Sequence, residues 1–213
     1  MQRLSSNPFG IEYFQQLAAL SEQFQVSDRT NTSLSFSEGI DQAARLVRQQ
    51  TQQADHKVMF IGNGGSAGIA SHQAVDYWRN GGFPAVAFND ASLLTCIGND
   101  FGYEQVFSKP ISMLGKAGDV LIAISSSGQS ANILAGVHQA LSLGCKVITL
   151  SAFKPDNPLR QLGDLNFYVP TFSYGFAEIS HLAISHCILD GLMKGAIGTL
   201  PLAVENQLVS ADS

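Results

Sequence analysis

Two short polar segments of the sequence have the composition of anion-binding loops. Gly62-Asn63-Gly64-Gly65-Ser66 directly follows the apolar run at 58–61, and a serine-rich segment at 125–130 directly follows the apolar run at 120–124. A loop that joins a buried strand to a helix presents free backbone N–H groups and the positive end of the helix dipole to an anion. The serine-rich loop contains no Lys or Arg, so it suits a phosphate that is held by hydrogen bonds.

The two loops differ in how strongly they predict a ligand. A helix cap needs one hydroxyl, whereas Ser125, Ser126, Ser127 and Ser130 surround a single glycine, and this arrangement favours phosphate binding. The first loop lacks the G-x-G-x-x-G spacing of a dinucleotide site. A structural turn is an alternative explanation of its glycines.

A histidine and a carboxylate follow the first loop at helical spacing. His72 and Asp76 are four residues apart, so they share one face of a helix. Such a pair can bind a metal ion, or it can act as a base with its orienting partner. A solvated pair on the helix surface is the alternative interpretation.

The last helical segment carries further ionisable side chains in an apolar setting. Glu178 and His186 are eight residues apart, about 80° around a helix of about 3.6 residues per turn, so both can face one cleft. His181 lies three residues after Glu178 and is an alternative partner. A lone histidine in such a helix is often a core residue, but two histidines and a carboxylate favour a functional site.

A third polar site lies between these segments. Asn99 and Asp100 follow Thr95-Cys96-Ile97-Gly98 in a largely apolar setting and precede Phe101 and Gly102. The pattern fits an Asx turn with a glycine exit. It also fits an amide and a carboxylate that contact substrate hydroxyls.

These residues need an α/β framework to position them, and the hydrophobic pattern predicts one. From residue 57 onward apolar runs alternate with helical patterns, which is typical of a doubly wound parallel sheet. We expect a three-layer α/β sandwich with a central, mainly parallel five-stranded sheet, preceded by two amphipathic helices. The predicted strands are 57–61, 85–88, 120–124, 146–150 and 165–169, and the predicted helices are 9–24, 36–53, 66–78, 91–114 with a break at 98–102, 130–143 and about 175–193.

The division of the chain follows from the same pattern. Residues 1–195 form one domain, and residues 196–213 form a less periodic C-terminal tail. Ser35 or Ser37 is expected to cap the second helix. The two early helices either pack on a partner subunit or cover a face of their own sheet.

Composition excludes several classes of protein. A net charge of −5 argues against nucleic-acid binding, which usually needs a basic face. No apolar run approaches the roughly 18 residues of a membrane span, and no basic segment precedes an apolar stretch at the N-terminus. Cys96, Cys145 and Cys187 form no C-x-x-C pair, and we expect them to be buried and reduced in a cytoplasmic protein.

Together the motifs resemble the sugar isomerase (SIS) family, and within it the phosphoheptose isomerases. The resemblance runs from the N-terminal helices to about residue 195. It is carried by the four segments 62–66, 97–102, 125–132 and 147–150.

The resemblance implies a role for each motif. The segments Asn63, Gly64, Gly65, Ser66 and Ser125, Ser126, Ser127, Ser130 correspond to a sugar-phosphate cradle, and Asn99 and Asp100 correspond to hydroxyl contacts. The family's zinc site, which overlaps the substrate site, falls on His72, Asp76, Glu178 and His186. Its acid–base pair falls on Asp76 and His186, and the family is a homotetramer whose active sites are lined by more than one subunit.

The chain departs from the family pattern at two of these positions. It has Asp76 where the family usually has Glu, and Glu178 where the family usually has Gln. The shorter Asp reaches about 1.5 Å less far, which affects proton transfer unless the backbone compensates. Glu178 adds a negative charge that would strengthen a cation site and repel an anion.

The leading interpretation is an aldose–ketose isomerase. We expect it to convert sedoheptulose 7-phosphate to D-glycero-D-manno-heptose 7-phosphate through an enediol, with Asp76 and His186 transferring the protons. One alternative is a non-catalytic SIS protein that senses a sugar phosphate or bridges a partner such as a replication initiator. Another is an isomerase of a different sugar phosphate, for example a hexose phosphate. The presence of His72 and His186 favours an enzyme.

Overall fold

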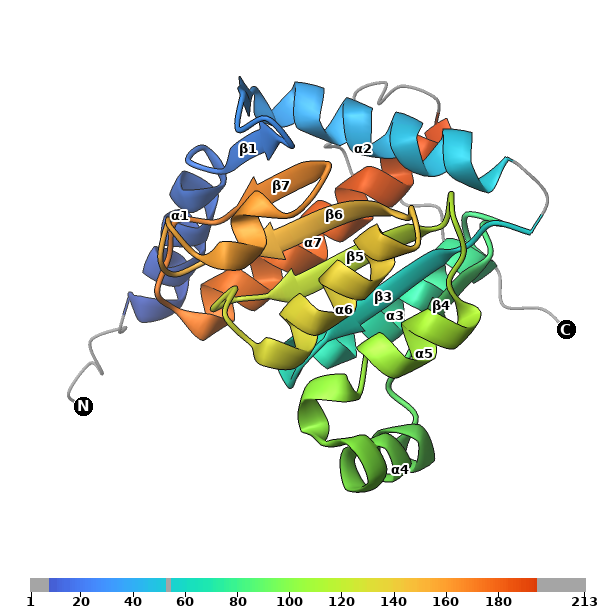
Figure 1. Cartoon of the computed structure of the whole chain (residues 1–213). Helices are drawn as coiled ribbons and strands as arrows, with labels where there is room; N and C mark the ends of the chain where they lie inside the picture. Colours follow the sequence, from blue (N-terminus) through green and yellow to red (C-terminus); the bar gives the residue numbers. More distant parts are fainter. Residues whose placement is uncertain (1–7, 53–54, 195–213) are drawn as a thin grey trace, which may run out of the picture.

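The computed structural model describes residues 8–52 and 55–194, so the predicted tail at 196–213 lies outside the described residues. Its centre is a seven-stranded sheet in the order β2-β1-β7-β6-β5-β3-β4 (Figure 1). The five predicted strands are confirmed, and all of them pair in parallel. The strands are β1 Gln25–Asp28, β2 Ser33–Leu34, β3 Val58–Gly62, β4 Ala85–Ala87, β5 Val120–Ser125, β6 Lys146–Ser151 and β7 Leu165–Tyr168.

The prediction of five strands was incomplete, because a short N-terminal hairpin extends the sheet. β1 pairs with β2 and with β7, antiparallel in both cases. Strands of four and two residues that mix polar and apolar side chains are too short to show a period in the sequence. In the turn between them, the Asp28 carboxylate accepts hydrogen bonds from the backbone N–H groups of Thr30 and Thr32.

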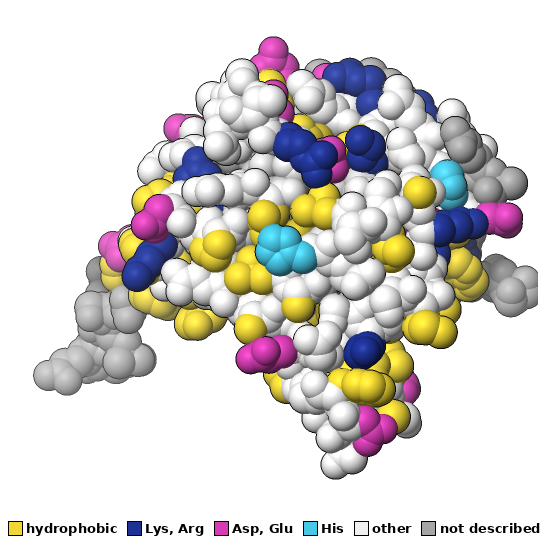
Figure 2. Space-filling model, viewed as in Figure 1, with side chains coloured by type: hydrophobic (Ala, Val, Ile, Leu, Met, Phe, Trp, Pro, Cys, Tyr) yellow, Lys and Arg dark blue, Asp and Glu magenta, His cyan; other side chains and the backbone are white. Residues whose placement is uncertain are grey.

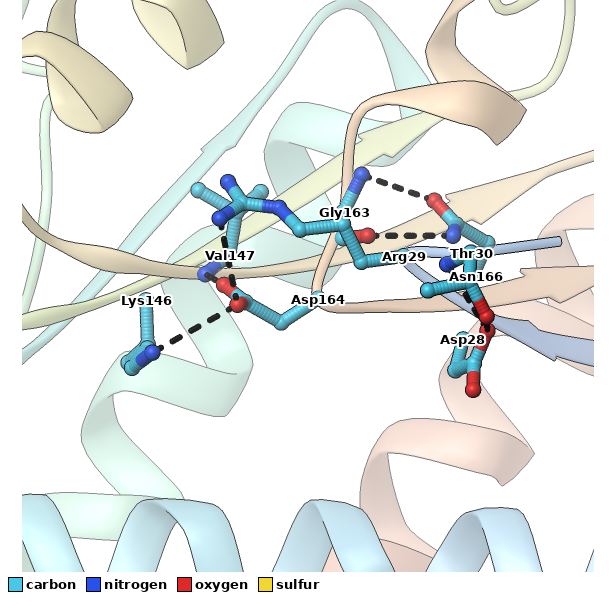
Figure 3. Close-up of polar contacts among 8 residues, drawn as sticks. All are labelled: Asp28, Arg29, Thr30, Lys146, Val147, Gly163, Asp164 and Asn166. Atoms are coloured by element: carbon cyan, nitrogen blue, oxygen red, sulfur yellow. Dashed lines mark hydrogen bonds and ion pairs between the residues drawn. The ribbon is translucent and has the colours of Figure 1, made fainter. Parts of the chain in front are cut away.

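Polar contacts tie this hairpin to the neighbouring strands (Figure 3). The Asp164 carboxylate lies 3.8 Å from Arg29 and 3.6 Å from Lys146, and it accepts the backbone N–H of Val147 at 2.8 Å. The Asn166 side chain bridges the N–H and C=O groups of Gly163. Arg29 thereby links the hairpin turn to Asp164, which directly precedes β7 and also contacts β6.

Helices cover both faces of the sheet and complete the predicted three layers. In Figure 1, α3 and α7 lie behind the sheet, and α5 and α6 lie in front of it. Alternate side chains of each central strand enter two separate cores: Phe60 packs on the α3 and α7 side, and Met59 and Ile61 pack on the other. The α-helices are α1 Phe9–Ser21, α2 Phe36–Thr51, α3 Gly65–Arg79, α4 Ala91–Phe101, α5 Ser108–Leu114, α6 Ala131–Ser142 and α7 Tyr174–Lys194.

The sequence signals for helix ends are largely met. Ser35 caps α2 through a reciprocal capping box with Glu38, so the first of the two candidate caps is the one used. The break predicted at 98–102 within the 91–114 segment occurs at the last of these residues. α4 continues to Phe101 and stops at Gly102, which has a φ of 87°. In Figure 1 α4 projects from the body of the molecule.

The prediction that all three cysteines are buried was wrong for one of them. Cys96 is exposed on α4, Cys187 is partly buried, and Cys145 is buried. Burial raises the pKa of the Cys145 thiol to about 11. None of the three forms a disulfide. Among the described residues, no helix is long and apolar enough to cross a membrane.

Candidate active site

The two polar loops line one pocket at the carboxyl ends of β3 and β5. The pocket has a volume of about 210 Å³. Ligands of open α/β sheets bind at this edge, where strands lead into helices. Its lining includes every residue of the predicted cradle, together with Tyr174 and Glu178: Asn63, Gly64, Gly65, Ser66, Ser125, Ser126, Ser127 and Ser130.

Two helices begin at this pocket without a side-chain cap. Gly64 precedes α3 with φ of 55°, and neither Gly64 nor Ser130, which precedes α6, supplies a side-chain hydrogen bond to its helix. The first N–H groups of a helix have no partner within the helix. The N-terminal ends of α3 and α6 therefore offer backbone donors and positive dipole ends to an anion.

A pair of amides holds the two loops together. Asn63 and Asn132 each donate a side-chain hydrogen bond of 2.9 Å to the other's oxygen. Asn132 is 3% exposed, so this link is shielded from water. It fixes the spacing of the two loops, and with it the shape of the pocket.

The serine loop is supported from behind by a buried asparagine. Gly128 turns the loop with φ of 62°, and a Cβ at this position would lie 2.0 Å from Asn157 Oδ1. Asn157 is fully buried and donates hydrogen bonds to Ser151, Ala152 and Lys154. Only glycine fits here, because both the backbone conformation and the space exclude a side chain.

A second cluster contains three of the predicted metal ligands. His72 Nε2 and His186 Nδ1 lie 3.2 Å and 3.6 Å from Asp76 Oδ2. One donor atom from each residue falls within 4.8 Å of the other two. Two imidazoles and a carboxylate are the usual donors of a catalytic zinc site, which keeps one position open. The three residues therefore fit a divalent cation.

The shorter side chain of Asp76 still reaches both histidine rings. Its Oδ2 atom lies between them, and the two rings are 5.3 Å apart with a steep mutual tilt of 67°. The loss of one methylene relative to Glu is therefore compatible with contact to both histidines. On the other side of His186, the Gln73 side-chain nitrogen lies 3.1 Å from Nε2.

The structure places Glu178 with the anion pocket and outside this histidine–aspartate cluster. A Cβ on Gly65 would lie 2.4 Å from the Glu178 carboxyl carbon, so the carboxylate rests against the first turn of α3. The positive end of the helix stabilises a negative charge at this point. Glu178 is therefore placed as a pocket residue, separate from the three clustered ligands.

His181, the alternative to His186, lies inside the protein. It is fully buried, and neither ring nitrogen makes a hydrogen bond of normal geometry among the described residues. Burial lowers its pKa to about 4, an effect only partly opposed by the nearby Ser151 backbone. His181 is thus a neutral core residue that cannot face the cleft.

Asn99 and Asp100 are not brought into the pocket within this chain. Both lie near the end of the projecting helix α4, where the Asn99 amide donates to the neighbouring Asp100 carboxylate. The hydroxyl of Tyr103, just beyond α4, does reach the pocket, because it donates to Asn63 Oδ1 at 3.4 Å.

The packing of α3 against α7 relates the anion pocket to the cluster. The two helices run side by side in the same direction, with Gly65 against Glu178 and Asp76 beside His186. At about 1.5 Å per residue, His72 is roughly 10 Å along α3 from Gly65. An extended sugar phosphate anchored at the serines would bring its far end toward the cluster.

Sequence reasoning assigned no role to four residues of this region. Tyr174 lines the pocket, Tyr103 contacts Asn63, Asn132 links the two loops, and Gln73 contacts His186. Asn132 lies in the 125–132 motif, two residues after the serine loop, and this position was the available signal. The other three gave none, because their roles depend on how distant elements pack together.

Comparisons with known proteins support one family. The sequence matches the SIS domain over residues 12–152. A phosphoheptose isomerase of Histophilus somni is 38% identical over 179 residues, covering 79% of this chain and 90% of the relative. One from Edwardsiella ictaluri is 43% identical over 162 residues, covering 73% and 82%. The solved structure of the phosphoheptose isomerase of Neisseria gonorrhoeae matches with a TM-score of 0.74 and 32% identity, covering 85% of this chain and 96% of that one.

Proposed function

The chain belongs to the SIS domain family, and we infer from its relatives and its pocket that it is a phosphoheptose isomerase. It interconverts sedoheptulose 7-phosphate and D-glycero-D-manno-heptose 7-phosphate. The observation that carries this assignment is the joining of both polar loops in one pocket beside a histidine–aspartate cluster. A protein that only binds a sugar phosphate needs the pocket and has no use for the cluster.

The phosphate binds in the pocket between the two uncapped helix ends. The hydroxyls of Ser125, Ser126, Ser127 and Ser130 donate to its oxygens, together with the first N–H groups of α3 and α6. Glu178 and Asn63 contact sugar hydroxyls at the edge of the pocket. Asn99 and Asp100 also remain proposed hydroxyl contacts, through the subunit neighbouring their own.

Asp76 and His186 transfer the protons. One of them removes a proton from the carbon next to the carbonyl, the C–H electrons form the double bond of an enediol, and the carbonyl oxygen takes a proton from the other group. The first group then returns its proton to the former carbonyl carbon, and the hydroxyl on the adjacent carbon gives its proton to the second group to leave the new carbonyl. The approach of the two groups to 3.6 Å allows both to serve one pair of carbons.

We propose that a zinc ion is held by His72, Asp76 and His186, whose donor atoms fit it. When bound, the ion would stabilise the negative charge that develops on the substrate oxygens during proton transfer. Asp76 and His186 thus belong to both the metal site and the acid–base pair.

The proposed function predicts that the protein turns over sedoheptulose 7-phosphate. Purified protein incubated with sedoheptulose 7-phosphate and zinc is expected to produce aldoheptose 7-phosphate, detected by NMR of the anomeric protons. Treatment with a chelator is expected to reduce the rate, and added zinc to restore it. Absence of product both with and without zinc would contradict the assignment. Faster turnover of a hexose phosphate in the same assay would change the substrate and keep the reaction class.

We further propose that the enzyme works as a homotetramer. Large apolar side chains are exposed on α1, α3 and α5, among them Phe14 at 69%, Trp78 at 62% and Met113 at 82%. Figure 2 shows hydrophobic side chains between thinly scattered charges, and only 14% of the residues are charged. Apolar surface of this extent favours association. Light scattering is expected to give the mass of four chains, and a monomer mass would contradict the proposal.

A further inference from the structure

Gln73 is a buried polar residue that contacts the back of His186. It is 0% exposed and lies on α3 at the interface with α7. Its side-chain nitrogen is 3.1 Å from His186 Nε2, while the opposite edge of the ring, at Nδ1, lies 3.6 Å from Asp76 Oδ2. Its carbonyl oxygen, Oε1, is buried without a hydrogen-bond partner among the described residues.

A side-chain amide can form a hydrogen bond with either tautomer of a neutral imidazole. A neutral histidine carries one ring hydrogen, so one nitrogen donates and the other accepts. With the hydrogen on Nδ1, facing Asp76, the Gln73 N–H donates to Nε2, as the observed arrangement allows. When Nδ1 gives its lone pair to a cation, the hydrogen is on Nε2, and a half-turn of the amide brings the unpartnered Oε1 to accept it.

We propose that Gln73 is a positioning residue for His186, an inference that rests on the proposed function. Its amide gives His186 Nε2 a hydrogen-bond partner in both tautomers. The ring therefore keeps its orientation toward Asp76 whether Nδ1 carries a hydrogen or binds a cation. A second hydrogen bond of this kind commonly orients metal-binding histidines, and its loss typically costs about 10–100-fold in affinity or activity.

Two substitutions of similar size separate this role from simple packing. Gln73→Met removes both polar atoms, and Gln73→Glu keeps only acceptors, which favour a hydrogen on His186 Nε2. We expect Gln73→Met to bind zinc about 10–100-fold more weakly than the wild type and Gln73→Glu to bind it at least as tightly. The measurement is competition with a chromophoric chelator, without substrate.

If Gln73 only fills space, Gln73→Met should bind zinc more tightly than Gln73→Glu. Met suits an apolar interface, whereas Glu would bury a charge there. Unaltered zinc affinity in Gln73→Met, or equal losses in both variants, would overturn the proposal. Urea unfolding of the three proteins shows whether each variant is folded under the assay conditions.

A second readout uses the metal-free protein. The ¹⁵N chemical shifts of the His186 ring report which nitrogen carries hydrogen. We expect the hydrogen on Nδ1 in the wild type and on Nε2 in Gln73→Glu; the same form in both would overturn the proposal even if no zinc binds. If both readouts come out as expected but the protein does not turn over sedoheptulose 7-phosphate, the proposed function is contradicted and the role of Gln73 stands.

Discussion

Replacing His186 with Asn is expected to lower kcat for sedoheptulose 7-phosphate by roughly 10²–10⁴-fold, the usual contribution of a positioned acid or base. The ring lies 3.6 Å from Asp76 and on the α7 side of the cluster, so its loss removes one member of the proposed proton-transfer pair. The KM should change little, because the proposed phosphate site is the separate serine-lined pocket. Steady-state kinetics with a fixed zinc concentration provide the measurement.

The chain offers a matched control for this experiment. His138 is exposed on α6, away from the cluster, and His138→Asn should retain wild-type kinetics. Asp76→Asn should resemble His186→Asn, and the double variant should be little slower than either single variant, because residues that act as a unit are not additive. Wild-type activity in His186→Asn would exclude the ring from proton transfer.

Acid is expected to destabilise the fold through His181. Burial lowers the pKa of this ring to about 4, whereas a histidine in an unfolded chain titrates near about 6.5. As the pH falls between these values, the unfolded chain binds a proton that the folded chain does not. The contribution of His181 to the free energy of unfolding is therefore full above about pH 6.5 and falls by about 1.4 kcal/mol per pH unit below it, a total of roughly 3 kcal/mol near pH 4.

Urea unfolding at several pH values tests this expectation. His181→Leu removes the titrating ring, so its free energy of unfolding should depend less steeply on pH than that of the wild type between about pH 6.5 and 4. His138→Asn changes an exposed ring and should keep the wild-type slope. Equal slopes in the wild type and His181→Leu would show that another group causes the acid dependence.

The sequence was most informative where local pattern alone decides the structure. Continuous apolar runs identified the five parallel strands, because strands covered on both faces have little polar character. The hairpin of β1 and β2 was not visible, because its pairing depends on β7, far along the chain. The same limit applies to the cluster: helical spacing placed His72 with Asp76, but the packing of α3 on α7 decides that His186 joins them.

The placement of Glu178 illustrates why a shared helix face is insufficient evidence. Its spacing from His186 allowed both to face one cleft, and they do lie along the same helix junction. Eight residues of helix also separate them by about 12 Å along the axis. Glu178 therefore contacts the start of α3 at Gly65, whereas His186, about two turns further along α7, contacts Asp76.

The antiparallel pairing of β1 with β7 has a consequence for how the chain folds during synthesis. Residues 25–28 leave the ribosome early, yet their partners at 165–168 are among the last elements of the sheet to be made. Contacts between such distant segments form slowly, because a long loop must close first. The parallel strands can assemble as they emerge, while the N-terminal hairpin must wait for β7. Until then its backbone groups are open to pairing with other chains, so the hairpin at residues 25–34 depends on timely completion of the protein.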